Sequence, residues 1–203
     1  MSIHGTGSRY GRGGHMGQST CIAEYRSQVK LLDGHAALIR PIASSDRDEL
    51  RSFFSRLGPE TMFLRFHYAK PLVSEQELQT YCDCDGDNTF TLVAQMDRSG
   101  CPRIVGVGRY DRLPSTHLAE VAFVVEDREQ GNGIGTHLLA QLALVAKDKG
   151  LLQFVAETVT YNESMLSIFR KYDQALRREV DGESCRVTFS ISPVRPSTTR
   201  SSQ

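Results

Sequence analysis

Three glycines at alternate positions lie between a predicted strand and a predicted long helix: Gly131, Gly133 and Gly135. Glycine leaves room where a backbone must approach a ligand or adopt a positive φ. The free N–H groups of a first helical turn point the same way, and the helix dipole favours an anion there. A tight turn alone needs fewer glycines. The pattern therefore predicts a binding site for a phosphate or diphosphate.

Two common phosphate-binding patterns do not fit this stretch. The nucleotide-kinase P-loop requires Gly-Lys and then Ser or Thr at the helix start, whereas the chain reads Gly133-Ile134-Gly135-Thr136. The dinucleotide fingerprint requires glycine or alanine three residues after Gly133, and Thr136 occupies that position. The residues exclude both classes of nucleotide site.

The run Gln130-Gly131-Asn132-Gly133-Ile134-Gly135 fits the pattern Gln/Arg-x-x-Gly-x-Gly/Ala at a strand-to-helix turn. In this run, and in the order of its elements, the segment from about 35 to 191 resembles the Gcn5-related N-acetyltransferases (GNAT family), which use acetyl-CoA. The resemblance implies an α/β fold with a central, mostly antiparallel, twisted sheet flanked by helices. It also implies acetyl-CoA as the co-substrate and an amine as the acceptor.

The same resemblance implies which residues hold the donor. Backbone N–H groups from Gly131 to Thr136 would bind the CoA diphosphate. The backbone of 123–125 would pair with the pantetheine arm like an added strand, and a bulge would splay this strand from its neighbour. Asn162 matches the asparagine that reaches the CoA arm. The expected donor-binding residues are Phe123, Val124, Val125, Gln130, Gly131, Asn132, Gly133, Ile134, Gly135, Thr136 and Asn162.

The chemistry also needs a base. An amine attacks a thioester only when neutral, and a lysine with a pKa of about 10.4 is mostly protonated at pH 7. A carboxylate beside the acetyl group can accept the proton. The segment Ala119-Glu120-Val121-Ala122-Phe123 is similar to the Ala-Glu-x-Ala-Phe context of a bacterial protein-lysine acetyltransferase subgroup. The resemblance implies Glu120 as the catalytic general base, and Glu157 in the next predicted strand is the alternative.

The last predicted helix departs from the family pattern. Many members read Tyr-x-x-x-Gly-Phe there, and the tyrosine can protonate the departing thiolate. Here Phe169 takes the tyrosine position, and Asp173-Gln174 replaces Gly-Phe, so the following turn is expected to differ. Tyr172, water or no acid at all are the alternatives, because a thiolate leaves readily near neutral pH.

Hydrophobic periodicity predicts the elements that carry these residues. Alternating or β-branched runs predict strands at 35–42, 89–96, 104–110, 118–125, 153–159 and 186–191. Helical spacing predicts helices at 45–57, after 74, at 133–149 and at 164–172, with a short helical or irregular segment near 62–66. Residues 1–30 are predicted as a flexible Gly-rich tail, 31–193 as the acetyltransferase domain, and 194–203 as a second flexible tail.

Composition narrows the class of protein. The 203 residues carry 24 basic and 24 acidic side chains, so bulk charge predicts no nucleic acid partner and no anionic membrane. No apolar run is long enough to span a bilayer. The 5 cysteines match no disulfide framework and no zinc pattern, so we expect reduced thiols, no metal and a cytoplasmic location.

The sequence leaves several functional alternatives open. The leading one is an N-acetyltransferase that works by direct transfer in a ternary complex, with a protein lysine or a small amine as the acceptor. The second is a non-catalytic acyl-CoA-binding sensor or regulatory module. A third is a different donor such as succinyl-CoA, for which Arg109 is a candidate cation. The oligomeric state is open, and a homodimer is one possibility.

Overall fold

The computed structural model describes residues 25–67, 73–98 and 100–192. Within them, one sheet has the strand order β1-β2-β3-β4-β5-β6-β8-β7. All neighbouring strands are antiparallel except β5 and β6. The strands are β1 Ser27–Lys30, β2 Ala36–Pro41, β3 Thr89–Asp97, β4 Pro102–Arg112, β5 Leu118–Val125, β6 Gln153–Val159, β7 Arg177–Asp181 and β8 Ser184–Ser190. The predicted mostly antiparallel α/β fold is confirmed.

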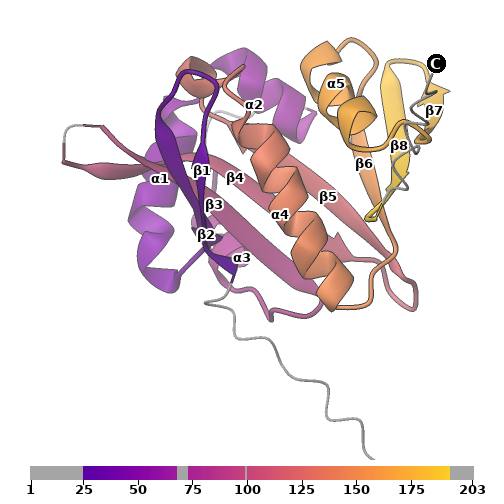
Figure 1. The fold of residues 1–203 in the computed structure, drawn as a ribbon, viewed down its shortest axis with the longest axis horizontal. Helices are drawn as coiled ribbons and strands as arrows, with labels where there is room; N and C mark the ends of the chain where they lie inside the picture. Colours follow the sequence, from indigo (N-terminus) through magenta and orange to yellow (C-terminus); the bar gives the residue numbers. More distant parts are fainter. Residues whose placement is uncertain (1–24, 68–72, 99, 193–203) are drawn as a thin grey trace, which may run out of the picture.

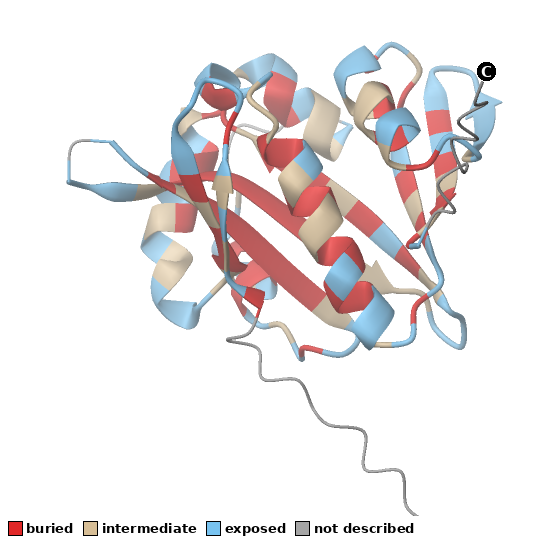
Figure 2. Cartoon of the chain, viewed as in Figure 1, coloured by how far each residue is buried: buried red, intermediate tan, exposed pale blue. Residues whose placement is uncertain are grey.

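The helices divide between the two faces of the sheet. They are α1 Arg47–Arg56, α2 Pro59–Phe66, α3 Glu75–Cys82, α4 Ile134–Asp148 and α5 Glu163–Tyr172. One buried cluster joins α4 and α5 to one face, and a second joins α1, α2 and α3 to the other. Figure 1 shows α4 crossing the sheet, and Figure 2 shows that the central strands beneath it are buried. None of the described helices is both long and apolar enough to cross a membrane.

Two glycines of β4 let α4 lie close to the sheet. A Cβ placed on Gly106 would meet Ile134 Cγ2 at 3.0 Å, and one placed on Gly108 would meet Leu142 Cδ1 at 3.0 Å. Contacts this short are tighter than packed side chains normally allow. The absence of side chains at these positions therefore lets α4 lie close to β4, the strand that pairs with β5.

Strands β5 and β6 separate along their length. They pair in parallel only from Leu118 with Gln153 to Glu120 with Val155. Beyond this point β6 continues its pairing with β8, and β5 continues its pairing with β4. The register of β5 with β4 is continuous, so the bulge expected in β5 is not what opens the gap. The register shift lies instead between Ala94 and Gln95 of β3.

The strands β1 and β7 were missing from the sequence prediction. The predicted tail of residues 1–30 is wrong for its last residues, because Ser27–Lys30 pair with Ala36–Ile39 and Tyr25 is buried. Residues 1–24 and the predicted tail 194–203 lie outside the described residues. Both missed strands lie at the sheet edges, and every residue of β7 is exposed, so β7 has no apolar alternation to detect.

Candidate active site

The glycine-rich loop delivers the chain from β5 into α4. Gly131 and Gly133 have φ values of 78° and 90°, in the left-handed region that favours glycine. Gly133 is the N-cap residue of α4. Within the described residues, no backbone N–H from Gly131 to Thr136 donates a hydrogen bond. The loop thus presents a group of free donors at the positive end of a long helix, which suits an anion.

Gly135 has a different reason to be glycine. It lies inside α4, and a Cβ there would meet Ile168 Cδ1 at 3.0 Å and Phe123 Cε2 at 3.2 Å. The missing side chain lets the first turn of α4 pack against both β5 and α5. The N–H groups of this turn are thereby held beside the gap between β5 and β6.

Two cavities meet at this gap. The first, which we call the loop cavity, has a volume of about 470 Å³ and is lined by the glycine loop, the end of β5, α2 and α5. The second, the strand cavity, has a volume of about 320 Å³ and is lined by β5, β6 and the end of α2. The residues Leu64, Arg65, Phe123 and Met165 line both cavities. One bound molecule can therefore extend from the loop towards the middle of β5.

The expected donor residues of β5 line the loop cavity. Antiparallel pairing alternates the main-chain groups of a strand between its two sides. Glu126 N donates to Val105 O, which places the N–H of Val124 on the β4 side as well. The main-chain groups of Phe123 therefore face the gap, and so does the N–H of Val125. Of the three predicted residues, Val124 contributes its side chain to the wall but uses its main chain in the sheet.

Glu120 lies where the pairing of β5 with β6 ends. It is exposed, it lines the strand cavity, and its side chain lies on the sheet face that α1 and α2 cover, as does that of Val124. Among the described residues, no partner forms a hydrogen bond or ion pair with the Glu120 carboxylate. The carboxylate is thus available to a group that enters the strand cavity.

The alternative base, Glu157, also lines the strand cavity but is already paired. Its Oε1 accepts from Arg186 at 2.6 and 3.2 Å. The hydrogen bond to Glu157 is the main cause of the raised pKa of Arg186, and the charge of Glu120 adds a smaller contribution. Arg186 therefore competes for Glu157 with any incoming ammonium group, whereas no described residue forms a hydrogen bond or ion pair with Glu120.

Two of the polar side chains predicted to bind the donor, those of Asn162 and Gln130, have structural partners. Asn162 is buried, lines the loop cavity and caps α5: its Oδ1 accepts from Met165 N at 3.2 Å and its Nδ2 donates to Thr158 Oγ1 at 3.1 Å. Gln130 Nε2 donates to Val125 O at 3.0 Å and to Thr61 Oγ1 at 3.1 Å. Both side chains hold the walls of the cavity in place.

A small hydrogen-bond network fastens α2 to the glycine loop. Asp127 Oδ2 accepts from Gly58 N at 2.9 Å, and its Oδ1 accepts from Thr61 Oγ1 at 2.8 Å. Gln130 reaches the same hydroxyl. We call Gly58, Thr61, Asp127 and Gln130 the α2 latch. Because α2 also supplies Leu64 to both cavities, the latch fixes one shared wall relative to the loop.

Replacing Thr61 with valine should lower the free energy of unfolding by about 1–2 kcal/mol, because the buried Thr61 hydroxyl no longer bonds to the charged Asp127 or to Gln130. Urea denaturation measures this change. Thr80→Val is the matched control, since the Thr80 hydroxyl is exposed and bonds only within α3. Equal destabilisation by both substitutions would show that the latch adds no stability.

Two buried glutamates lie in the segment directly before the glycine loop. Glu126 and Glu129 are 3% and 2% exposed. Arg56 donates to Glu126 at 3.0 Å, Arg98 donates to Glu129 at 2.9 Å, and Arg103 lies 3.5 Å from both carboxylates. Buried charges persist only when they are paired in this way. The network joins α1 and the β3–β4 hairpin to the segment that precedes the glycines.

The structure does not place Tyr172 at the site. Its hydroxyl donates to Ile191 O at 2.7 Å, it lines neither cavity, and burial raises its pKa. Phe169, at the usual tyrosine position, lines the strand cavity. Asp173 accounts for the altered turn, because its carboxylate accepts from Ala175 N and Ser190 N, both at 2.9 Å. Of the alternatives for the acid, water or no acid remain.

Other features of the sequence fall outside the cavities. Arg109 is buried, and its guanidinium bonds to Asp111, to Thr80 O and to Thr91, so its donors are occupied. The described cysteines are free thiols. In the ranges that the structure describes, no three His, Cys, Asp or Glu side chains gather closely enough to hold a metal ion.

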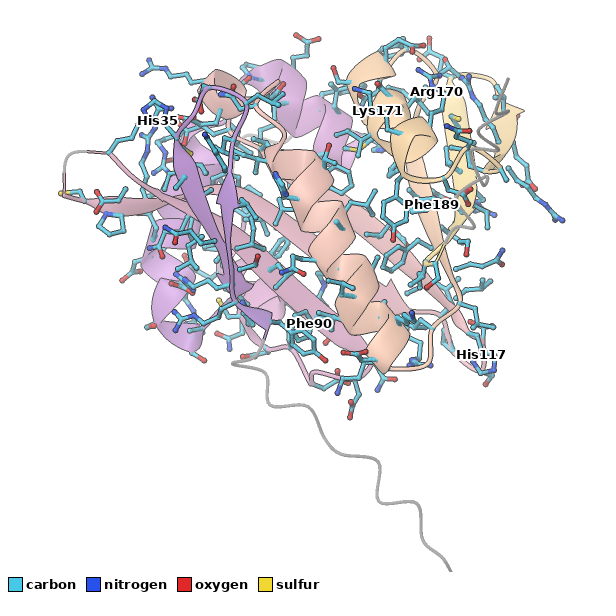
Figure 3. All side chains as sticks on the ribbon, viewed as in Figure 1. His35, Phe90, His117, Arg170, Lys171 and Phe189 are labelled. Atoms are coloured by element: carbon cyan, nitrogen blue, oxygen red, sulfur yellow. The ribbon has the colours of Figure 1, made fainter. Side chains whose placement is uncertain are left out.

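Several wall residues of the loop cavity were missed by sequence reasoning. They are Leu32, Thr61, Leu64, Ser164 and Lys171. Figure 3 shows Lys171 projecting from α5 beside Arg170. Leu32 and Thr61 come from segments far from the glycine loop along the chain. No local periodicity or spacing links them to that loop, so a single sequence carries no signal for them.

Comparison with known proteins agrees with this geometry. The family model described as "Acetyltransferase (GNAT) family" matches residues 50–173. Acetyltransferase PA5475 of Pseudomonas aeruginosa is 32% identical over 66% of this chain and 72% of its own length. Acetyltransferase Pat of Mycolicibacterium smegmatis is 28% identical over 74% of this chain, which spans only 45% of that relative.

A solved structure shows the same fold. The crystal structure of the GNAT domain of S. lividans PAT matches with a TM-score of 0.74 and 28% identity, covering 83% of this chain and 98% of that domain. The family match spans more than half of the chain and includes β5, the glycine loop, α4 and α5. The chain therefore belongs to the acetyltransferase (GNAT) family of acyltransferases, which use acyl-CoA co-substrates.

Proposed function

We propose that this protein moves the acetyl group of acetyl-CoA to a primary amine by direct transfer in a ternary complex. The observation that carries the proposal is the pair of adjoining cavities. One contains the free N–H groups of the glycine loop, the other contains the unpaired Glu120, and Phe123 lines both. A diphosphate at the loop and an arm along β5 would bring the thioester to the side of Glu120.

The donor would be held mainly by the main chain. The N–H groups of Gly131 to Thr136 bind the diphosphate of CoA, and the gap-facing groups of Phe123 pair with the pantetheine arm. The N–H of Phe123 or of a neighbouring gap-facing residue can also donate to the thioester oxygen as it gains negative charge, which lowers the barrier to attack. Lys171, on the cavity wall, adds a cation near the charged end of the donor.

Glu120 would act as the general base. The acceptor enters the strand cavity as an ammonium ion and gives a proton to the carboxylate, directly or through water. The neutral nitrogen then attacks the thioester carbon, the C–S bond breaks, the CoA thiolate leaves, and the second proton of the nitrogen passes to water to give the neutral amide. No side-chain acid is required in this scheme, since the thiolate is stable near neutral pH. Arg65 and His67 border the acceptor side of the cavity.

The acceptor is a primary amine, either a protein lysine or a small molecule. Two of the similar proteins are named Pat or PAT, and their names do not state which acceptor they acetylate. The occupied guanidinium of Arg109 gives no support to a donor with a carboxylate at its acyl end. Acetyl-CoA is accordingly the donor we propose, in a cytoplasmic enzyme.

Acetyl-CoA should raise the melting temperature, because the ligand binds the folded state. At 100 times Kd the stabilisation is about 2.7 kcal/mol, which corresponds to roughly 5–10 °C for a domain of this size. Differential scanning fluorimetry measures the shift. Acetyl-pantetheine, which has the thioester but no diphosphate, is the control ligand. An unchanged melting temperature at millimolar acetyl-CoA contradicts the donor site.

The second candidate is a non-catalytic acyl-CoA sensor, favoured by Phe169 in the tyrosine position and by the occupied Tyr172 hydroxyl. A thiol-release assay with lysine peptides and small amines separates the two functions. Release of CoA that depends on the amine supports the transferase. Binding of acetyl-CoA without release in any amine supports the sensor.

A further inference from the structure

The turn between β1 and β2 is held in a defined shape beside the glycine loop. Leu31 N donates to His35 O at 2.8 Å, and Gly34, at a φ of 87°, donates to Leu31 O at 3.1 Å. Asp33 accepts from His35 N at 3.0 Å. Figure 3 shows His35 at this end of the hairpin. The turn is therefore an ordered part of the molecule, with Leu32 near its tip.

Two contacts fasten this turn to the loop. Leu32 N donates to Asn132 O at 3.2 Å, between Gly131 and Gly133. Arg98 bridges the turn and the buried support of the loop, because its guanidinium lies 3.6 Å from Asp33 and 2.9 Å from Glu129. The position of Leu32 relative to the free N–H groups is thus set from both sides.

The side chain of Leu32 is exposed to solvent at the wall of the loop cavity. It is 81% exposed, it lines the loop cavity, and its Cγ lies 3.8 Å from the place of a Cβ on Gly133. A single exposed leucine is ordinary on a protein surface. Here, however, the leucine lies beside the free N–H groups of the loop, and an apolar side chain adds nothing to anion binding. An apolar group attached to a bound anion is the partner that this side chain can contact.

We propose that Leu32 is a donor-binding residue that packs against the apolar group of CoA next to the diphosphate. This inference rests on the proposed acetyl-CoA site and extends it to a segment outside residues 50–173, which the family model matches. Two groups of CoA have this chemistry: the dimethyl group of the pantoate unit and the adenine ring. When Leu32 covers either group, apolar surface of the group and of the side chain is removed from water, which favours binding.

The direct test is the acetyl-CoA affinity of Leu32→Ala by calorimetry. Loss of part of the buried apolar contact should raise Kd roughly 3- to 10-fold. Leu144→Ala is the matched control, because Leu144 is a 56% exposed leucine of α4 that lines neither cavity. The melting temperature without ligand should not change in either variant. Equal affinity in Leu32→Ala and the wild type overturns the proposal.

A charged variant and two fragments sharpen the result. Leu32→Glu should weaken binding by more than Leu32→Ala, and added salt should reduce the difference, because the new carboxylate faces the phosphates. An adenosine bisphosphate and phosphopantetheine then identify the contacted group, as only the fragment that carries it should lose affinity. A wild-type protein that fails to bind acetyl-CoA contradicts the proposed function itself, whereas normal wild-type binding with unaffected Leu32 variants contradicts only this contact.

Discussion

Replacing Glu120 with glutamine should lower kcat by about 100-fold or more, with little change in the affinity for acetyl-CoA. Glutamine keeps the size and shape of the side chain but cannot accept the proton of the incoming ammonium group. Glu120 lines the strand cavity and not the loop cavity, so the diphosphate site is unaffected. Steady-state thiol release gives kcat, and calorimetry gives the acetyl-CoA affinity.

Glu157→Gln is the control for this substitution. Glu157 lines the same cavity, but Arg186 already holds its carboxylate, so kcat should fall only a few-fold. The substitution also removes the ion pair between Glu157 and Arg186, which is exposed and contributes little to stability. Unchanged turnover in Glu120→Gln, with a large loss in Glu157→Gln, would transfer the role of base to Glu157. Unchanged turnover in both would leave water as the base.

The part of the site that the sequence predicts well is local. β5, the glycine loop and α4 follow one another along the chain, and each carries its own pattern: β-branched residues, glycines at alternate positions and helical spacing. The structure agrees with all three elements, and the free N–H groups of Ile134 to Thr136 follow directly from a helix start. Short-range geometry therefore translates into sequence pattern without information about distant segments.

The part that the sequence does not predict depends on distant segments. Thr61 has two partners near residue 130, yet nothing in the run from Pro59 to Phe66 indicates them. Leu32 belongs to a hairpin whose first strand, Ser27–Lys30, has a single aliphatic residue and was assigned to a tail. β7 was missed because an edge strand exposed on both faces needs no hydrophobic alternation. Tertiary pairing alone determines these features.

Tyr172 shows the same limit for a side chain. Phe169 occupies the position of the family's tyrosine. Tyr172, three residues later, is an alternative acid only because it is near that position in the sequence. The hydroxyl instead bonds to Ile191 O, just beyond the end of β8, and Tyr172 lines neither cavity. The direction of a side chain on a short helix depends on what packs against the helix, which spacing within the helix does not reveal.

Gly133→Glu should weaken acetyl-CoA binding by at least about 100-fold. A unit-charge pair about 4 Å apart interacts by roughly 4 kcal/mol at an effective dielectric constant of 20, and here the charges repel. The side chain has room, because the nearest atoms to a Cβ are 3.8 Å or more away, so it can reach the loop cavity without unfolding α4. Calorimetry or the thermal shift with acetyl-CoA measures the loss.

Gly133→Gln separates charge from backbone strain. Glutamine and glutamate have nearly the same shape, and both suffer at a φ of 90°, which costs a non-glycine residue roughly 1–2 kcal/mol. Both variants should therefore melt at similar, lowered temperatures, while Gly133→Glu binds acetyl-CoA much more weakly than Gly133→Gln. Equal affinities in the two variants would mean that no phosphate lies near Gly133. In that case the free N–H groups of the loop serve another ligand or none, since an anion held by them must feel a carboxylate placed at their centre.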